Sequence, residues 1–365
     1  MASLSRLLLA LLSVVLCAAP SAADQAAQRI IAIGDLHGDY KAFLDIVEAA
    51  GLSDAKAHWT GGRTILVQLG DVPDRGPDTL DIIHHLQRLE KAAPRAGGKV
   101  VALIGNHEAM NMTGDLRYTT PAEFAAFTDE SSVARREKLF ELNRESIVAF
   151  YRKSEPGLSE DDAKQKWFAT FPLGRIEHDI AWSPKGEIGR WVLTHPAIAK
   201  IDGNLFVHGG LSVETVARPM DEVNDEVREA LIAQAADAAT ILTDEYGPLW
   251  YRGNVVREPV PASTPSPEGP GESASRARPS REEELGIVLK AYHARRLVVA
   301  HTPDLNGIEA SGDGRLIRVD TGISSYYGGP HSYLALEGNR AVAYDEDKDG
   351  KWVSRELPTP PETAP

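Results

Sequence analysis

Cysteine is almost absent from this sequence of 365 residues, and its one cysteine, Cys17, lies within an N-terminal apolar run. Loss of that run as part of a signal peptide would leave no thiol in the chain. A chain without thiols has no disulfides, no thiolate metal ligands and no cysteine nucleophile. The folded protein must then depend on its apolar core for stability and on other side chains for its chemistry.

Positive charge is also scarce, because 39 lysine and arginine residues face 53 aspartate and glutamate residues, which gives a net charge of −14. A surface with this balance does not attract a nucleic-acid backbone through bulk charge, so we expect no nucleic-acid partner. An anionic ligand would have to be attracted locally, by a metal ion or by a few well-placed arginines.

The apolar run covers residues 7–19 and is shorter than the roughly 20 residues of a membrane-spanning helix. Arg6 precedes it, and residues 20–23 (PSAA) supply the small side chains of a cleavage site. This pattern predicts a signal peptide over residues 1–23, a periplasmic or secreted protein, and no stable membrane association after cleavage. An uncleaved N-terminal anchor is the alternative.

Hydrophobic patterning predicts an α/β fold, because apolar strands alternate with amphipathic helices from the first part of the chain onwards. The early strands are predicted at residues 28–33, 64–69 and 99–104, and the early helices at 40–50 and 78–93. Later strands are predicted at 191–194, 204–207, 297–300 and 315–319, a helix at 222–242, and a closing hairpin at 333–344.

Three segments have a different composition from this α/β pattern. Residues 113–165 are polar and helical in pattern, which predicts a helical insertion lobe over the site. Residues 259–280 are rich in proline, serine, glycine and glutamate, which predicts a disordered insertion inside one domain that spans residues 28–355. The proline- and threonine-rich residues 357–365 are expected to form a loose tail.

Metal-binding side chains follow five of the predicted strands at the point where each strand ends. They are Asp35 and His37, Asp71, Asn106 with His107, His208, and His301, each close to a glycine or a small residue. The carboxyl-end loops of strands are where α/β sheets place their sites, so we expect these side chains to converge. Oxygen and imidazole donors without thiolate suit manganese, iron, zinc or magnesium, and one carboxylate can bridge two such ions.

The motifs that carry these residues resemble one known family. They are GDLHGD at residues 34–39, GDVPDRG at 70–76, GNHE at 105–108, HGG at 208–210 and AH at 300–301. In this order they resemble the phosphoprotein phosphatase branch of the calcineurin-like metallophosphoesterases. NMTGDLRY at 111–118 and GPLWYRG at 247–253 resemble its Shewanella-like subgroup. The resemblance implies a metallophosphatase fold, with two face-to-face β-sheets flanked by helices.

The resemblance also implies two divalent metal ions per chain, manganese in first place and iron, zinc or magnesium as other choices. Six residues would hold them: Asp35 and His37 the first ion, Asn106, His208 and His301 the second, with Asp71 as the bridge. A hydroxide that bridges the ions would attack the phosphorus atom directly. The enzyme would then be a phosphoric monoester hydrolase that acts on phosphoserine, phosphothreonine or phosphotyrosine side chains.

Further roles follow from the same resemblance. His107 would be the general acid that protonates the leaving oxygen, and Asp74 would orient it. Arg75 would grip the phosphate, and Arg252 is the candidate for a second clamp.

Three more residues are candidates for the substrate pocket. Arg117 lies in the GDLRY stretch, and Tyr326 and Tyr327 follow a strand-end loop on the leaving-group side. Aromatic rings in such a loop are suited to stack on an aryl ring.

Two other functions compete with the protein phosphatase hypothesis. A nucleotide or dinucleoside polyphosphate hydrolase would share the early motifs, but such relatives usually carry GNHD where this chain has GNHE, and they lack GPLWYRG. A non-catalytic phosphate- or peptide-binding protein on the same fold is the second alternative. It has no support here, because all six predicted ligands, His107 and Asp74 are present.

Overall fold

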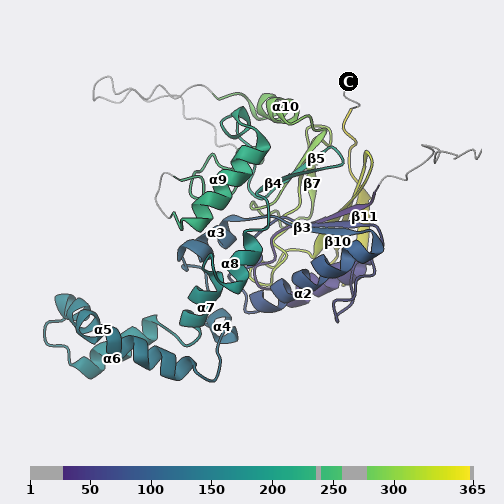
Figure 1. Cartoon of the computed structure of the whole chain (residues 1–365). Coiled ribbons are helices and arrows are strands. Elements are labelled where there is room, and N and C mark those ends of the chain that lie inside the picture. Colours follow the sequence, from purple (N-terminus) through teal and green to yellow (C-terminus); the bar gives the residue numbers. More distant parts are fainter. Residues whose placement is uncertain (1–27, 236–239, 257–277, 362–365) are drawn as a thin grey trace, which may run out of the picture.

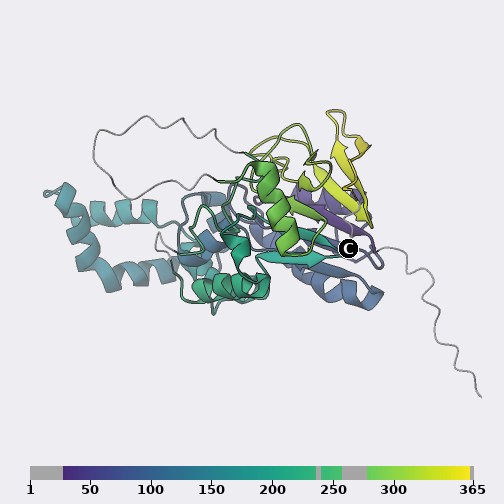
Figure 2. The same cartoon turned by 90° about the horizontal axis from the view of Figure 1, so that it is seen from above.

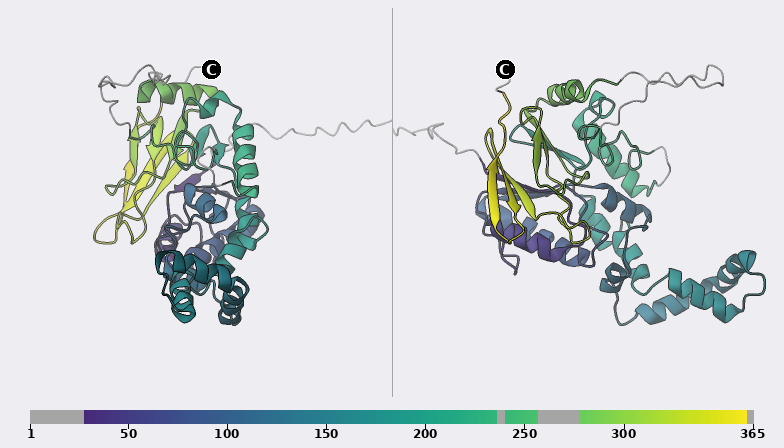
Figure 3. Two further views of the ribbon diagram at one scale, coloured as in Figure 1. Left: turned by 90° about the vertical axis from the view of Figure 1, so that its left-hand side faces the viewer. Right: turned by 180° about the vertical axis from the view of Figure 1, so that it is seen from behind.

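The computed structural model describes residues 28–235, 240–256 and 278–361 (Figure 1). The predicted signal peptide, residues 259–277 of the predicted disordered insertion, and the last four residues of the predicted tail lie outside these ranges. Two β-sheets stack face to face, and helices cover their outer sides (Figure 3, right). The predicted α/β metallophosphatase architecture is therefore confirmed.

The first sheet has six strands in the order β11-β10-β9-β1-β2-β3. Its three N-terminal strands are parallel, and the C-terminal hairpin joins them in antiparallel orientation through β9. The strands are β1 (Ile30–Ile33), β2 (Ile65–Gln68), β3 (Lys99–Ala102), β9 (Ser332–Glu337), β10 (Arg340–Glu346) and β11 (Trp352–Glu356).

The second sheet has five strands in the order β4-β5-β6-β8-β7. The central strands β5, β6 and β8 are parallel, and the two edge strands run antiparallel to them. The strands are β4 (Ile198–Ile201), β5 (Asn204–Val207), β6 (Arg296–Val299), β7 (Glu309–Ser311) and β8 (Leu316–Arg318).

Burial on both faces explains why β1 is an uninterrupted apolar run. Ile30 and Ala32 face the second sheet and pack in the same cluster as Phe206 and Val298. The alternate residues of β1, at positions 31 and 33, face the helices on the other side. Successive side chains of a strand point to opposite faces, so a strand between two apolar layers needs apolar residues at every position.

The helices cover the outer faces and form one projecting arm. α1 (Tyr40–Ala49) and α2 (Thr79–Ala92) cover the first sheet, whereas α9 (Met220–Ile232) and α10 (Arg281–Ala291) lie on the side of the second (Figures 1 and 3). The remaining α-helices are α3 (Asn106–Thr113), α4 (Pro121–Ala126), α5 (Ser132–Ser154), α6 (Glu160–Thr170), α7 (Arg175–Trp182) and α8 (Glu187–Val192). Two short 3₁₀ turns are η1 (Ala93–Ala96) and η2 (Thr215–Ala217).

The arm consists of α5 and α6, which extend away from the two sheets (Figures 1 and 2). They pack on each other through aromatic rings, with the Phe140 ring 5.8 Å from that of Trp167. The range predicted as a helical lobe over the site, residues 113–165, thus contains α4, α5 and most of α6. Across the described ranges, no helix has the length and apolar character needed to cross a membrane.

One predicted element is wrong and another is too long. Residues 191–194 do not form a strand, because α8 runs to Val192 and a turn follows. A run of three apolar residues does not distinguish a strand from a buried helical turn, and here the Trp191 indole is fixed by a hydrogen bond to Glu90. The predicted helix at 222–242 ends at Ile232, since Gln234 adopts a positive φ of 50° and donates to the Met112 carbonyl.

Candidate metal centre

The loop after β1 carries Asp35 and His37 and is held against the loop after β2. The backbone N–H groups of Leu36 and His37 both donate to the Asp71 carbonyl at 3.0 Å. His37 Nδ1 lies 3.1 Å from the carbonyl oxygen of Pro73, which only accepts, so Nδ1 carries the proton. The lone pair of His37 Nε2 is then free to face Asp35 and Asp71, whose carboxylate oxygens lie 3.8 and 3.9 Å away.

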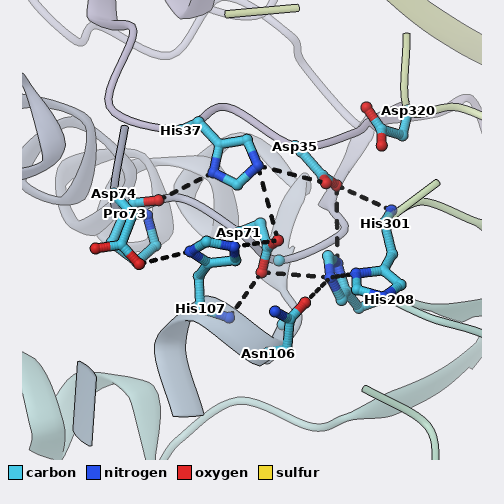
Figure 4. A network of polar contacts seen from close by, with 12 residues as sticks. Asp35, His37, Asp71, Pro73, Asp74, Asn106, His107, His208, His301 and Asp320 are labelled. Carbon is cyan, nitrogen blue, oxygen red and sulfur yellow. Dashed lines mark hydrogen bonds and ion pairs between the residues drawn. The ribbon is translucent and has the colours of Figure 1, made fainter. Parts of the chain in front are cut away.

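Asp71 lies at the centre of the site and is buried (Figure 4). Its Oδ2 atom lies 3.9 Å from His37 Nε2 and 3.8 Å from His107 Nε2. Its Oδ1 atom lies 3.3 Å from His208 Nε2 and accepts a hydrogen bond from the His107 backbone N–H at 3.0 Å. The two oxygens therefore face two different groups of donors, which is the arrangement a bridging carboxylate needs.

The group on the Oδ1 side comes from three further strand ends. His208 Nε2 lies 2.9 Å from Asn106 Oδ1 and 3.1 Å from His301 Nδ1. The other nitrogen of His208 lies 2.8 Å from the Leu69 carbonyl oxygen, which fixes its proton on Nδ1. An amide oxygen and two imidazole nitrogens thus converge beside Asp71 (Figure 4).

His107 forms a buried pair with Asp74 on the opposite side of Asp71. The Nδ1 atom of His107 lies 2.5 Å from Asp74 Oδ2, so the imidazole is held with Nε2 directed at the Asp71 side. Asp74 also accepts hydrogen bonds from the Asn111 amide at 3.0 Å and the Thr119 hydroxyl at 2.8 Å. Burial alone would lower the pKa of His107, but the charges of Asp71 and Asp74 outweigh it and raise that pKa.

Glu108 is a functional residue that the sequence reasoning missed, although it ends the GNHE motif. Its carboxylate accepts from the backbone N–H groups of Asp71 at 2.9 Å, Val72 at 2.8 Å and Gly105 at 2.7 Å. It therefore ties the loop after β2 to the start of α3. Gly105 is required at this contact, because a Cβ there would lie 2.3 Å from Asp71 Oδ1.

Backbone strain is concentrated at the site. Ten described residues other than glycine have a positive φ, and half of them are predicted site residues: His37, Asp71, Asp74, Arg75 and His301. Such conformations cost about 1–3 kcal/mol each and persist only where the surroundings impose them. Their clustering at the ends of three strands indicates that the fold holds these side chains in place for function.

Another buried carboxylate, Asp320, was also missed by the sequence reasoning. It lies two residues after the end of β8, much as the predicted ligands follow their strands, and it lies against Asp35 (Figure 4). Burial raises the pKa of Asp320 to about 6. Burial, with the charges of Asp320 and Asp71, raises the pKa of Asp35 well above its usual range. Buried carboxylates that repel one another are stabilised when cations lie between them.

The donor set fits divalent metal ions. Burial lowers the pKa of His37 to about 3 and that of His301 well below its usual range, so both imidazoles are neutral. Neutral imidazole is the form that binds a metal. In addition, the Nε2 atom of His301 is buried and has no hydrogen-bond partner among the described residues. Carboxylate, amide and imidazole donors of this kind suit Mn²⁺, Fe²⁺ or Zn²⁺.

Arg75 lies beside these donors and is enclosed by three tyrosine rings. Its guanidinium carbon lies 4.6 Å from the ring centre of Tyr118, 4.8 Å from that of Tyr326 and 5.1 Å from that of Tyr327. Tyr327 also contacts His37, with ring centres 5.6 Å apart, so this cluster borders the first donor group. Tyr118 was not predicted. Arg117, which was, instead pairs with Asp115 at the surface.

Arg252 lies on the side of the second donor group. Its Nη1 atom donates to the His301 carbonyl at 2.7 Å and to the Thr302 hydroxyl at 3.0 Å. The ring of Trp250, two residues earlier, meets that of His301 edge to face at 5.6 Å. Arg252 therefore braces the loop that presents His301, and its charge adds to that of Arg75 at the site.

Residues 28–305 match the model of the calcineurin-like phosphoesterase family. An uncharacterized protein of Schizosaccharomyces pombe is 32% identical over 85% of this chain and 77% of its own length. Shewanella-like protein phosphatase 2 of Arabidopsis thaliana is 31% identical over 81% of this chain and 72% of its own length.

The fold resembles the crystal structure of a cold-active protein-tyrosine phosphatase of a psychrophilic Shewanella species. The TM-score is 0.62 at 23% identity, and the match covers 91% of this chain and 80% of that one. The family model covers most of the chain, and the predicted motifs converge in one buried site. This chain belongs to the calcineurin-like metallophosphoesterases and is an enzyme that hydrolyses phosphoric monoesters.

Proposed function

We propose that this chain is an exported protein phosphatase that works with two divalent metal ions. The observation that carries the proposal is Asp71, whose two carboxylate oxygens face two separate donor groups. Relatives named as protein phosphatases support the phosphoprotein substrate. Ions bound there supply positive charge for the phosphate and activate a water molecule as the nucleophile.

The ligands divide between the two oxygens of Asp71. Asp35 and His37 would hold the first ion, and Asn106, His208 and His301 would hold the second. Asp320, which lies against Asp35, would add negative charge on the side of the first donor group. Glu108 fixes the position of Asp71 relative to Asn106, because its carboxylate accepts hydrogen bonds from the backbone N–H groups of Asp71 and Gly105.

His107 is the residue that protonates the leaving oxygen in this proposal. Its Nε2 atom faces the centre, and Asp74 holds the other nitrogen, so the proton is available at Nε2. The net upward shift of its pKa favours the protonated form that an acid catalyst needs.

Arg75 grips the phosphate that all substrates share, and the tyrosine cluster around it contacts the group that differs between substrates. A planar guanidinium binds two phosphate oxygens at once. Tyr326 is 61% exposed, so its ring is open to a ligand. A structural neighbour named a protein-tyrosine phosphatase supports an aryl phosphate in this position.

We expect a preference for phosphotyrosine peptides over phosphoserine peptides in kcat/KM. Tyr326→Ala and Tyr327→Leu should reduce that preference about 2- to 12-fold, because they remove rings that stack on the aryl group. Tyr151→Ala, on the α5 arm, is the control and should leave the ratio unchanged. Steady-state kinetics with pairs of peptides that differ only in phosphotyrosine or phosphoserine measures this preference.

Arg75→Ala provides the complementary result. It should depress turnover of every phosphate ester together and leave the preference unaltered, since it acts on the shared group. If the ratio of kcat/KM for phosphotyrosine over phosphoserine peptides is the same in wild type and in both tyrosine variants, the two tyrosine rings do not contact the aryl group. A preference for dinucleoside polyphosphates over every phosphopeptide would favour the nucleotide hydrolase instead.

Export predicts a mature chain that begins close to Asp24. Intact-mass measurement of the protein from a periplasmic or secreted fraction should show loss of residues 1–23. Val14→Asp, which places a charge in the apolar run, should leave the precursor uncleaved in the cell. Full-length wild-type chain in a membrane fraction would mean an uncleaved anchor.

A further inference from the structure

A second set of metal-binding side chains lies outside the candidate centre, where three elements meet. Asp45 comes from α1, Glu346 ends β10, and His331 directly precedes β9. His331 Nδ1 lies 2.8 Å from Glu346 Oε2 and 3.4 Å from Asp45 Oδ2, and all three atoms lie within 4.8 Å of one another. We call these three residues the α1–β10 cluster.

We propose that the α1–β10 cluster binds one divalent transition-metal ion, most suitably Zn²⁺. One imidazole and two carboxylates form a donor set that zinc accepts, with water in the remaining position. Ligand atoms bound tetrahedrally at 2.0–2.2 Å lie about 3.3–3.6 Å apart. The two distances from His331 Nδ1, 2.8 and 3.4 Å, are close to that value, and no two of the ligand atoms are more than 4.8 Å apart, so small rotations of the side chains would form the site.

The surroundings of His331 are suited to an ion. Its Nδ1 atom is shielded from solvent and makes no well-aligned hydrogen bond, although carboxylate oxygens of Glu346 and Asp45 lie 2.8 and 3.4 Å away. The three side chains are between 21% and 33% exposed. This is open enough for an ion to enter and enclosed enough for their positions to be restrained.

Lys41 is the competing group at this site. Its ammonium contacts Asp45 Oδ2 at 2.5 Å, and the lysine side chain is 82% exposed. An exposed ion pair of this kind contributes little free energy, so an entering cation would displace it easily. Removal of the lysine should therefore strengthen metal binding, which is the opposite of what loss of a ligand would do.

The position of the cluster gives such an ion a structural effect. His331 ends the loop that carries Tyr326 and Tyr327, and the start of that loop is already fixed, because the Ser325 N–H donates to Asp39 Oδ2 at 2.8 Å. The His331 carbonyl already accepts a hydrogen bond from the Glu346 N–H at 2.8 Å, so an ion at the cluster would reinforce the attachment of this end to β10 and add an attachment to α1. The tyrosine cluster over Arg75 would then be restrained at both ends.

Zinc content of the purified full-length enzyme tests this inference. After dialysis against zinc, inductively coupled plasma mass spectrometry should find one ion fewer per chain in His331→Gln than in wild type. His84→Gln removes an exposed histidine on α2 and should retain the wild-type content. The difference between variants is the readout, so the result does not depend on how many ions the candidate centre holds or on the proposed substrate.

Two further variants keep the inference falsifiable if His331→Gln does not fold. Glu346→Gln should also lose one ion, and Lys41→Ala should bind the ion up to about fivefold more tightly in a zinc titration. Equal zinc content in wild type and Glu346→Gln, with equal affinity in Lys41→Ala, overturns the site. An equal loss in His84→Gln would mean adventitious binding to surface histidines only.

Discussion

Asp71→Ala should abolish the binding of both metal ions and lower turnover by more than about 10³-fold. The reason is that one carboxylate serves both donor groups, with Oδ2 toward His37 and Oδ1 toward His208. Loss of the ions removes the charge that stabilises the transferring phosphoryl group, a term of several kcal/mol. Metal analysis and p-nitrophenyl phosphate turnover on the same sample measure both effects.

The control for this variant must account for the backbone at Asp71. Its φ of 57° is unfavourable for alanine, so part of any loss could come from strain rather than from the missing ligand. Asp202 offers a match, because it has a φ of 44° in the turn between β4 and β5. Asp202→Ala should keep metals and activity. A folded Asp71→Ala enzyme that retains both ions would disprove the shared bridge.

Asp35→Ala should have a more selective effect than Asp71→Ala. Its carboxylate faces His37 and supports the loop of His301, because it accepts a hydrogen bond from the His301 backbone N–H at 3.2 Å. We expect weaker binding of the first ion, with the second largely retained, because Asn106, His208 and Asp71 remain. Metal titration of the two variants side by side distinguishes a shared ligand from one that serves a single ion.

The strands that lead into the site could be predicted because their sequence pattern is strong. β1 and β2 are buried on both faces, so β1 is an unbroken apolar run, β2 is apolar except for Gln68, and each is followed by a glycine and an aspartate. α8 and β4 could not be predicted in the same way. Each is short, and whether residues 187–201 become helix or strand depends on tertiary contacts such as the one between Trp191 and Glu90.

The same contrast holds within the site. The six predicted ligands and His107 come soon after strands of the two sheets, and α/β folds place their sites at the carboxyl ends of parallel strands, so their convergence could be predicted. Glu108 and Tyr118 were missed because their roles arise from contacts across the fold. Glu108 reaches the backbone 37 residues away in sequence, and Tyr118 is positioned by the hydrogen bond from the Arg75 N–H to its carbonyl. Asp320 did carry a signal, since it directly follows the strand predicted at residues 315–319, as the predicted ligands follow theirs.

His107→Asn should retain the metal ions and slow turnover by about 10²–10⁴-fold for substrates with poor leaving groups. His107 contacts Asp71 through its backbone N–H, which the substitution preserves, whereas the imidazole that donates the proton is lost. Asp74→Asn should give a smaller loss, because Asn111 and Thr119 still hold residue 74 while the charge that raises the pKa of His107 disappears.

A comparison of substrates with good and poor leaving groups tests whether His107 acts as an acid or only supports the structure. p-Nitrophenolate departs without a proton, whereas the alkoxide of a serine side chain needs one, so the loss in His107→Asn should be much smaller for p-nitrophenyl phosphate than for a phosphoserine peptide. A structural defect would slow both substrates equally. If turnover of both substrates falls equally while the metal content is unchanged, another group protonates the leaving oxygen. The His107–Asp74 pair would then have only a positioning role.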